Sequence, residues 1–236
     1  MFVLAAPEVG GLTPSFDTFL AVRAAADARA AVCGHSVPVT VLLRPRLGTC
    51  EYRSSELQQM EADADRFLSA GADGIAFAAL ENFGTEFRMD RRACAPLVAR
   101  AHKKGRHAVF HRAFDRVRDR QSGLQDLIGL EFDRVITAGG GATGLAQDSA
   151  HRLRADVAFA AWDLEVTVAG GIGPGRAASV ASATGCRSLL GAFREPREPA
   201  PLGTVRFGPP HRPFRQARVC AVLAELNDWL AEPDAD

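Results

Sequence analysis

The feature that most constrains the fold of this chain is a repeated pattern in which a short apolar run ends abruptly in charged or glycine-rich residues. Residues 109–110 are apolar and lead directly into the polar stretch 111–115. The same order recurs at 42–46, 135–141 and 166–173. Buried strands that end in such residues are typical of the active face of a (β/α) barrel, so we predict an α/β fold of the TIM (β/α)8 type.

The apolar and amphipathic patterns predict seven strands with helices between them. Such strands form a parallel sheet, because right-handed crossovers are the easy connection between them. One strand of an eight-stranded barrel is therefore not visible in the sequence. We expect strands at 2–5, 37–43, 73–77, 107–111, 134–137, 165–169 and 187–190. We expect helices that start near residues 13–15, 54, 90, 118, 144, 174 and 214.

Length and composition favour a single barrel domain over residues 1–236. Within it we expect a Pro/Arg-rich loop at 194–213 and a final amphipathic helix at 214–231. Lys plus Arg equals Asp plus Glu at 28 each, and this balance argues against a nucleic-acid or anionic-membrane binder. No apolar run approaches the roughly 18 residues of a membrane span, so we expect none.

Five cysteines are dispersed along the chain without a CxxC pair. An odd, scattered set indicates reduced thiols, so we expect a cytoplasmic protein. Cys50, in the loop after Arg46, is the one thiol placed at the predicted active face, and it is a weak candidate metal ligand.

Arg44 and Arg46 flank Pro45 directly after a predicted buried strand. Residues two apart on an extended chain point the same way, so both guanidinium groups can enter the mouth of the barrel and bind an anion. The alternative is a pair of surface arginines in an Arg-rich chain.

His111, Arg112 and Asp115 follow the central strand. His111 is a candidate general acid or base, because the pKa of histidine lies near neutral pH. Arg112 is a candidate clamp for a carboxylate or phosphate, and Asp115 can orient either of them. In the alternative interpretation, Asp115 only neutralises Arg112 in a structural pair.

Two glycine loops, 139–141 and 170–173, each follow a strand and precede a helix. Glycine allows positive φ and close backbone approach, and the helix dipole attracts anions, so Gly139, Gly170 and Gly171 are candidate anion-binding residues. If the missing strand is the first, the second loop follows strand seven, where barrels often bind phosphate. The alternative is tight packing of the turns without a ligand.

Four stretches together resemble the CutC family of copper homeostasis proteins, in this order and at similar spacing. They are GGLTPS at 10–15, LRPR at 43–46, GADG at 71–74 and FHRAFD at 110–115. The resemblance covers essentially residues 2–190. It implies a TIM barrel, often a homo-oligomer, that is linked to cytoplasmic copper handling and has copper as a possible ligand.

The chain departs from the family pattern at both ends of the resemblance. Family members usually begin with a strand and helix that are absent here, in agreement with the strand that is not visible above. Phe2 and Leu4 stand at the positions of the acid and the thiol usually proposed to bind copper, so both groups are missing here. The His common in the last strand is also absent from 188–190. The cationic half of the site remains: Arg44, Arg46, His111 and Arg112, with Asp115 and Thr137.

Three functions stay open at this point. The first is copper homeostasis, with copper bound weakly if at all and by ligands other than the family's cysteines. The second is an enzyme, or a relic of one, that binds a small phosphorylated or carboxylated molecule. It would use Arg44, Arg46, Arg112 and loop 170–173 as anion clamps and His111 as general acid/base. The third is a pseudoenzyme whose open barrel edge, left by the missing strand, pairs with a partner or a second copy.

Overall fold

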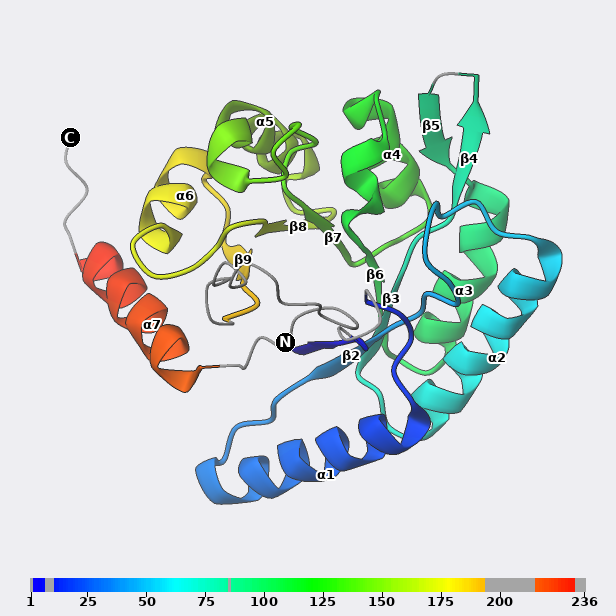
Figure 1. Ribbon diagram of the computed structural model, residues 1–236, viewed down its shortest axis with the longest axis horizontal. Helices are drawn as coiled ribbons and strands as arrows, with labels where there is room; N and C mark the ends of the chain where they lie inside the picture. The colour runs from blue at the N-terminus through cyan, green and yellow to red at the C-terminus, as the bar shows by residue number, and fades with distance from the viewer. Residues whose placement is uncertain (1, 7–10, 85, 194–214, 232–236) are drawn as a thin grey trace, which may run out of the picture.

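A computed structural model describes residues 2–6, 11–84, 86–193 and 215–231. Seven short strands form one parallel sheet in the order β1-β2-β3-β6-β7-β8-β9, and the sheet curls as half of a barrel (Figure 1). The prediction of a TIM-type α/β fold with seven strands is confirmed. The strands are β1 (Phe2–Leu4), β2 (Val39–Leu42), β3 (Gly74–Phe77), β6 (His107–Phe110), β7 (Arg134–Thr137), β8 (Glu165–Ala169) and β9 (Ser188–Leu190).

Helices follow the strands and cover the convex side of the sheet (Figure 1). They are α1 (Phe16–Cys33), α2 (Ser54–Ser69), α3 (Arg91–Lys103), α4 (Arg120–Gly129), α5 (Ala150–Ala160), α6 (Ala177–Thr184) and α7 (Gln216–Ala231). Two short 3-10 helices, η2 (Arg112–Arg116) and η3 (Ala146–Ser149), follow β6 and β7. The predicted loop 194–213 lies outside the described residues.

Several predicted helix starts need correction. Helix α4 begins at Arg120 rather than near 118, because the Asp119 side chain caps it by accepting a hydrogen bond from the Ser122 N–H. The stretch from 144 divides into η3 and α5, and α5 continues to Ala160. Helix α6 begins at Ala177, three residues after the predicted start at Pro174.

A hairpin between β3 and α3 was not predicted. It joins β4 (Leu80–Phe83) to β5 (Glu86–Met89) in an antiparallel pair. Its residues do not alternate cleanly between apolar and polar, so periodicity gave no signal for it.

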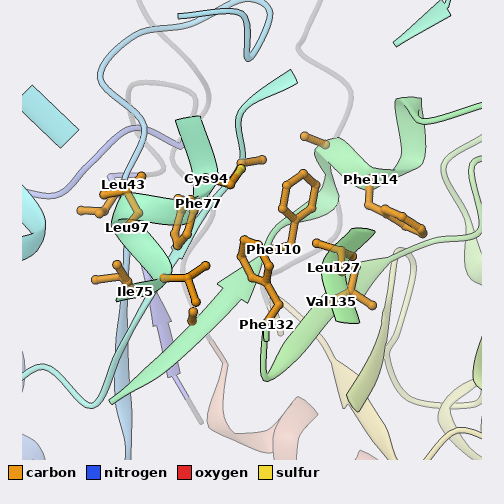
Figure 2. Packing of buried hydrophobic residues seen from close by; sticks show 14 of the residues in the cluster. Leu43, Ile75, Phe77, Cys94, Leu97, Phe110, Phe114, Leu127, Phe132 and Val135 are labelled. Carbon is orange, nitrogen blue, oxygen red and sulfur yellow. The ribbon is translucent and has the colours of Figure 1, made fainter. Parts of the chain in front are cut away.

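The two faces of the sheet differ in what they bury. Alternate residues of the strands point inward and form a thin layer with one side chain per strand: Val3, Leu42, Ala76, Val109, Ile136, Ala169 and Leu190. The outward residues pack with the helices in the main core, where Phe110 contacts the Phe114 and Phe132 rings edge-on (Figure 2). The functional groups at the strand ends therefore stand on a rigid, aromatic-rich base.

The sheet does not close within the described residues. Each end strand, β1 and β9, pairs with a single neighbour, and no ladder joins them in that part of the chain. The described residues contain seven of the eight strands that closure into a complete barrel needs, in agreement with the predicted missing strand. No described helix has the length and apolarity needed to cross a membrane.

Candidate functional site

The carboxyl ends of β2 and β6 bring Arg44 and His111 to the same edge of the sheet. Leu42 and Val109 point into the barrel, so residues two positions further along an extended chain point the same way. His111 continues the strand, with an extended backbone and an N–H that donates to Phe77 O at 3.1 Å. Strand β3, which lies between β2 and β6, is followed by the small, buried Ala78. The small side chain of Ala78 therefore leaves space between the strand ends for the larger side chains of Arg44 and His111.

The charge of Arg44 acts on three other groups. It lowers the pKa of His111 and opposes the rise that burial causes in the pKa of Cys50 and Tyr52, so all three lie within its electrostatic range. The Arg44 backbone N–H donates to Thr13 Oγ1 at 2.8 Å, and one guanidinium nitrogen donates to Gly48 O at 3.1 Å. These bonds fix the loop after β2 against the loop before α1.

Arg46 is turned toward its own loop. Its Nε donates to Glu56 Oε1 at 2.6 Å, and this hydrogen bond is the main cause of the raised pKa of Arg46. The same guanidinium lies 5.3 Å from the centre of the Tyr52 ring. Its remaining nitrogens donate to the carbonyl oxygens of Leu47, Thr49 and Glu51. The contacts of Arg46 therefore hold the 46–51 loop, and the structure does not place it beside His111.

His111 has a strongly perturbed pKa. Burial first, and the charge of Arg44 second, lower the pKa of its imidazole to about 4. Its Nδ1 accepts a hydrogen bond from the Ala113 N–H at 3.1 Å. Its Nε2 is buried and has no hydrogen-bond partner among the described residues.

Cys50 and Tyr52 lie within electrostatic range of Arg44, and burial raises the pKa of both side chains. The Tyr52 hydroxyl is near the Cys50 thiol but makes no hydrogen bond of normal geometry with it. Like His111 Nε2, this hydroxyl is buried and has no hydrogen-bond partner in the described part of the chain. Cys94 on α3 is close enough for Cys50 to influence it, and burial raises the pKa of Cys94 to about 12. Both thiols are therefore protonated at neutral pH.

Arg112 and Asp115 form an ion pair with Arg112 Nε 2.9 Å from Asp115 Oδ2. The other carboxylate oxygen of Asp115 accepts hydrogen bonds from the Thr137 hydroxyl at 2.6 Å and from the Ala138 and Gly140 N–H groups at 2.9 and 3.2 Å. These are the contacts of the structural alternative, in which the carboxylate ties η2 to the loop after β7.

Thr137 is fully buried and faces the helices, because its neighbour Ile136 faces the inside of the barrel. Its hydroxyl accepts hydrogen bonds from the Gly139 N–H at 3.0 Å and from Arg120 Nη2 at 2.9 Å. Arg120 also pairs with the buried Asp156 at 2.5 Å. Thr137 is thus part of an internal network, with none of its bonding capacity directed at the mouth.

The loop 170–173 is also closely packed. Gly170 has a φ of +100°, and a Cβ there would lie 2.9 Å from Ala138 Cβ and overlap Gly144 O. A Cβ on Gly171 would meet Leu145 Cδ2 at 2.8 Å. Just beyond the loop, the Gly175 and Ala178 N–H groups donate to the two carboxylate oxygens of Glu225 on α7, at 2.7 and 2.9 Å.

Sequence reasoning missed three members of this edge of the molecule. Tyr52 follows Cys50 by two residues, and that spacing was its only local signal. Arg120 and Glu225 carry no local signal at all, because the partners of Arg120 lie 17 and 36 residues away in the chain and those of Glu225 lie 47 to 50 residues away.

Comparison with known sequences identifies the family of this chain. The model of the CutC family matches residues 3–194. A protein named CutC from Caulobacter vibrioides is 32% identical over 196 residues, which cover 81% of this chain and 77% of that protein. The mouse copper homeostasis protein cutC homolog is 36% identical over 130 residues, or 55% of this chain and 43% of that protein.

Solved structures give the same result. A CutC crystal structure from Streptococcus agalactiae superposes with a TM-score of 0.69 at 25% identity, covering 77% of this chain and 82% of that one. An aldolase named QR15 superposes with a TM-score of 0.52 at 9% identity, covering 79% and 86%, and this likeness concerns the fold alone.

Proposed function

The chain belongs to the CutC family, and from this premise and the geometry at β2 and β6 we propose that it binds a small anionic molecule. One observation carries the proposal: the His111 Nε2 and Tyr52 hydroxyl groups are buried without a hydrogen-bond partner among the described residues, beside the charge of Arg44. A buried polar group left unpaired costs about 1–3 kcal/mol, and a ligand that pairs with such a group recovers this energy.

The test is a thermal-shift screen and isothermal titration with small carboxylates (pyruvate, citrate) and phosphates (inorganic phosphate, glycerol phosphate). We expect at least one of these probes to stabilise the wild type, and Arg44→Gln to weaken its binding by about tenfold or more. Arg29→Gln is the matched control, because Arg29 is exposed near the end of α1. Equal affinity in wild type and Arg44→Gln, or no probe bound by the wild type, would contradict the proposal.

The second candidate is the copper role named for the mammalian relative. Cu(I) is bound by soft ligands such as thiolates, and Cys50 with Cys94 is the nearest approach to such a set. These residues do not fit a copper site well, because burial keeps both thiols protonated and the described residues contain no group of three or more potential metal ligands. We therefore propose a role in copper homeostasis that does not depend on tight copper binding.

Isothermal titration with Cu(I) under reducing conditions tests this second candidate. We expect no stoichiometric binding at sub-micromolar affinity. Tight binding that Cys50→Ser abolishes would establish copper as the ligand and would overturn the anion proposal as the main function. All five cysteines are free, as in a reducing compartment, and we include a cytoplasmic location in the proposal.

A further inference from the structure

A pocket lies at the opposite end of the sheet from the β2/β6 edge. It has a volume of about 660 Å3, and its walls include the first residues of β6, β7 and β8, namely His107, Arg134 and Glu165. Trp162 and the buried Phe132 also line it. This volume lies within the range of small-molecule sites, about 300–1,000 Å3.

The ring of Trp162 is held in solvent beside this pocket. Trp162 is 85% exposed, the largest fraction among the exposed large apolar residues in the described part of the chain. It follows Ala161, whose φ of +44° is left-handed backbone that costs about 1–2 kcal/mol for a residue with a Cβ. The Arg187 guanidinium lies 5.1 Å from the centre of the Trp162 ring, within the range of a cation–π contact. The chain therefore presents an aromatic surface that already attracts one cation.

Two of the four carboxylates of the pocket are bound within the chain. Asp133 Oδ2 lies 2.9 Å from His102 Nε2, and Asp133 Oδ1 lies 3.6 Å from His107 Nδ1. Arg134 Nη2 lies 2.5 Å from Glu165 Oε2. These two carboxylates therefore hold the starts of β6, β7 and β8 together.

The other two carboxylates of the pocket belong to Glu131 and Asp163, which are both exposed. Neither makes an ion pair or a side-chain hydrogen bond with a described residue. At a pH where histidine is neutral, the four carboxylates face two guanidinium groups, those of Arg134 and Arg187. An excess of two negative charges remains, and it complements a ligand with two positive charges.

A metal dication does not fit, since the described residues contain no group of three or more side chains that could hold one. An organic dication fits, because its apolar chain can lie on the exposed indole while its charged ends reach the carboxylates. We propose that this pocket binds a linear aliphatic diamine, with its methylene chain on Trp162 and its ammonium groups at Glu131 and Asp163. This inference is independent of the proposed function, whose ligand is an anion at the other end of the sheet.

The test is isothermal titration of the full chain at about pH 8 with putrescine, beside butylamine, MgCl2 and tetralysine. We expect putrescine to bind, and Glu131→Gln, Asp163→Asn and Trp162→Ala each to weaken its binding by about threefold. All three side chains are exposed, so the variants should fold as the wild type does. Glu81→Gln is the matched control, because Glu81 is an exposed carboxylate on β4 outside the pocket, and it should leave the affinity unchanged.

The two tryptophans of the chain give a second readout. Putrescine should shift the indole N–H signal of Trp162 in 1H–15N spectra and leave that of Trp229 unchanged, with Trp162→Ala assigning the signals. No binding of putrescine, equal affinity for butylamine or MgCl2, or an equal loss in Glu81→Gln would overturn the inference. Binding of tetralysine without putrescine would also overturn it, because the pocket would then be a surface for a basic protein. None of these outcomes bears on the anion titrations of the Arg44 variant.

Discussion

The two glycine loops and the β2/β6 edge were predicted to bind anions for similar reasons, but the structure treats them differently. The loop after β7 directs its Gly140 N–H to Asp115, and the turn before α6 directs its Gly175 N–H to Glu225. At the β2/β6 edge, the His111 and Tyr52 donors have no such partner among the described residues. The comparison shows that a glycine loop establishes where an anion fits, while the rest of the fold determines whether the chain itself supplies that anion.

The largest effect we expect comes from filling the space at a glycine loop. Gly170→Ala introduces a Cβ that overlaps Gly144 O at a φ of +100°. We expect a loss of about 4 kcal/mol in the free energy of unfolding, from backbone strain and the overlap together, measured by urea denaturation.

Gly105→Ala is the matched control for strain alone, because Gly105 has a φ of +63° and a Cβ there would meet nothing within 4 Å. It should cost about 1 kcal/mol. Equal losses in the two variants would mean that loop 170–173 is not closely packed, and the contrast with the β2/β6 edge would then fail.

The pH dependence of the free energy of unfolding tests the burial of His111 at the β2/β6 edge. The pKa of His111 is about 4 in the folded protein against 6.5 for an ordinary histidine. Below pH 6.5 the unfolded chain takes up a proton that the folded chain does not, so the stabilisation is complete above pH 6.5 and is lost as the pH falls to about 4. The loss amounts to about 3 kcal/mol.

His111→Gln removes this titration and isolates it from the carboxylates, which titrate in both proteins. Denaturant unfolding of both should give a wild type that loses stability relative to the variant by about 3 kcal/mol between pH 7 and pH 4. Parallel pH profiles would show that His111 is not buried in its neutral form.

The carboxylate of Asp115 gives the next largest effect. Asp115→Ala leaves the Thr137 hydroxyl and the Ala138 and Gly140 N–H groups without their acceptor, at a cost of about 2–3 kcal/mol in urea unfolding. Asp126→Ala is the control, since it removes only the partly exposed pair with Arg91 and should cost less than about 1 kcal/mol. If Asp115→Ala cost no more than this control, the carboxylate would be free for a ligand.

The sequence predicted the strands well, because buried parallel strands leave short apolar runs that end at polar residues. It placed His111 at the mouth for the same reason, since its position follows from the β6 pleat. It gave no signal for the direction of the Arg46 and Thr137 side chains. The direction of Arg46 depends on Glu56, ten residues along the chain, and that of Thr137 depends on Arg120 from α4.

Local sequence pattern could not predict that the carboxylates of Asp115 and Glu225 accept hydrogen bonds from the backbone of these two loops. Glu225 lies in a helix that is far in sequence from loop 170–173, and only tertiary packing brings the two together.

Removing the charge of Glu225 gives the smallest of the expected effects. In Glu225→Gln, one amide oxygen still accepts a hydrogen bond, but the negative charge at the start of α6 and one of the two bonds are lost.

We expect Glu225→Gln to lower the free energy of unfolding by about 1 kcal/mol, with helix α7 still docked through the buried Val222. Hydrogen exchange should accelerate at the Gly175 and Ala178 amides and stay unchanged at Gly140, whose acceptor is Asp115. The exposed Glu81→Gln is the control and should leave all three amides unchanged. Unaltered exchange at Gly175 and Ala178 would mean that Glu225 does not fill this helix terminus, and the turn before α6 would then resemble the β2/β6 edge as a place for an external anion.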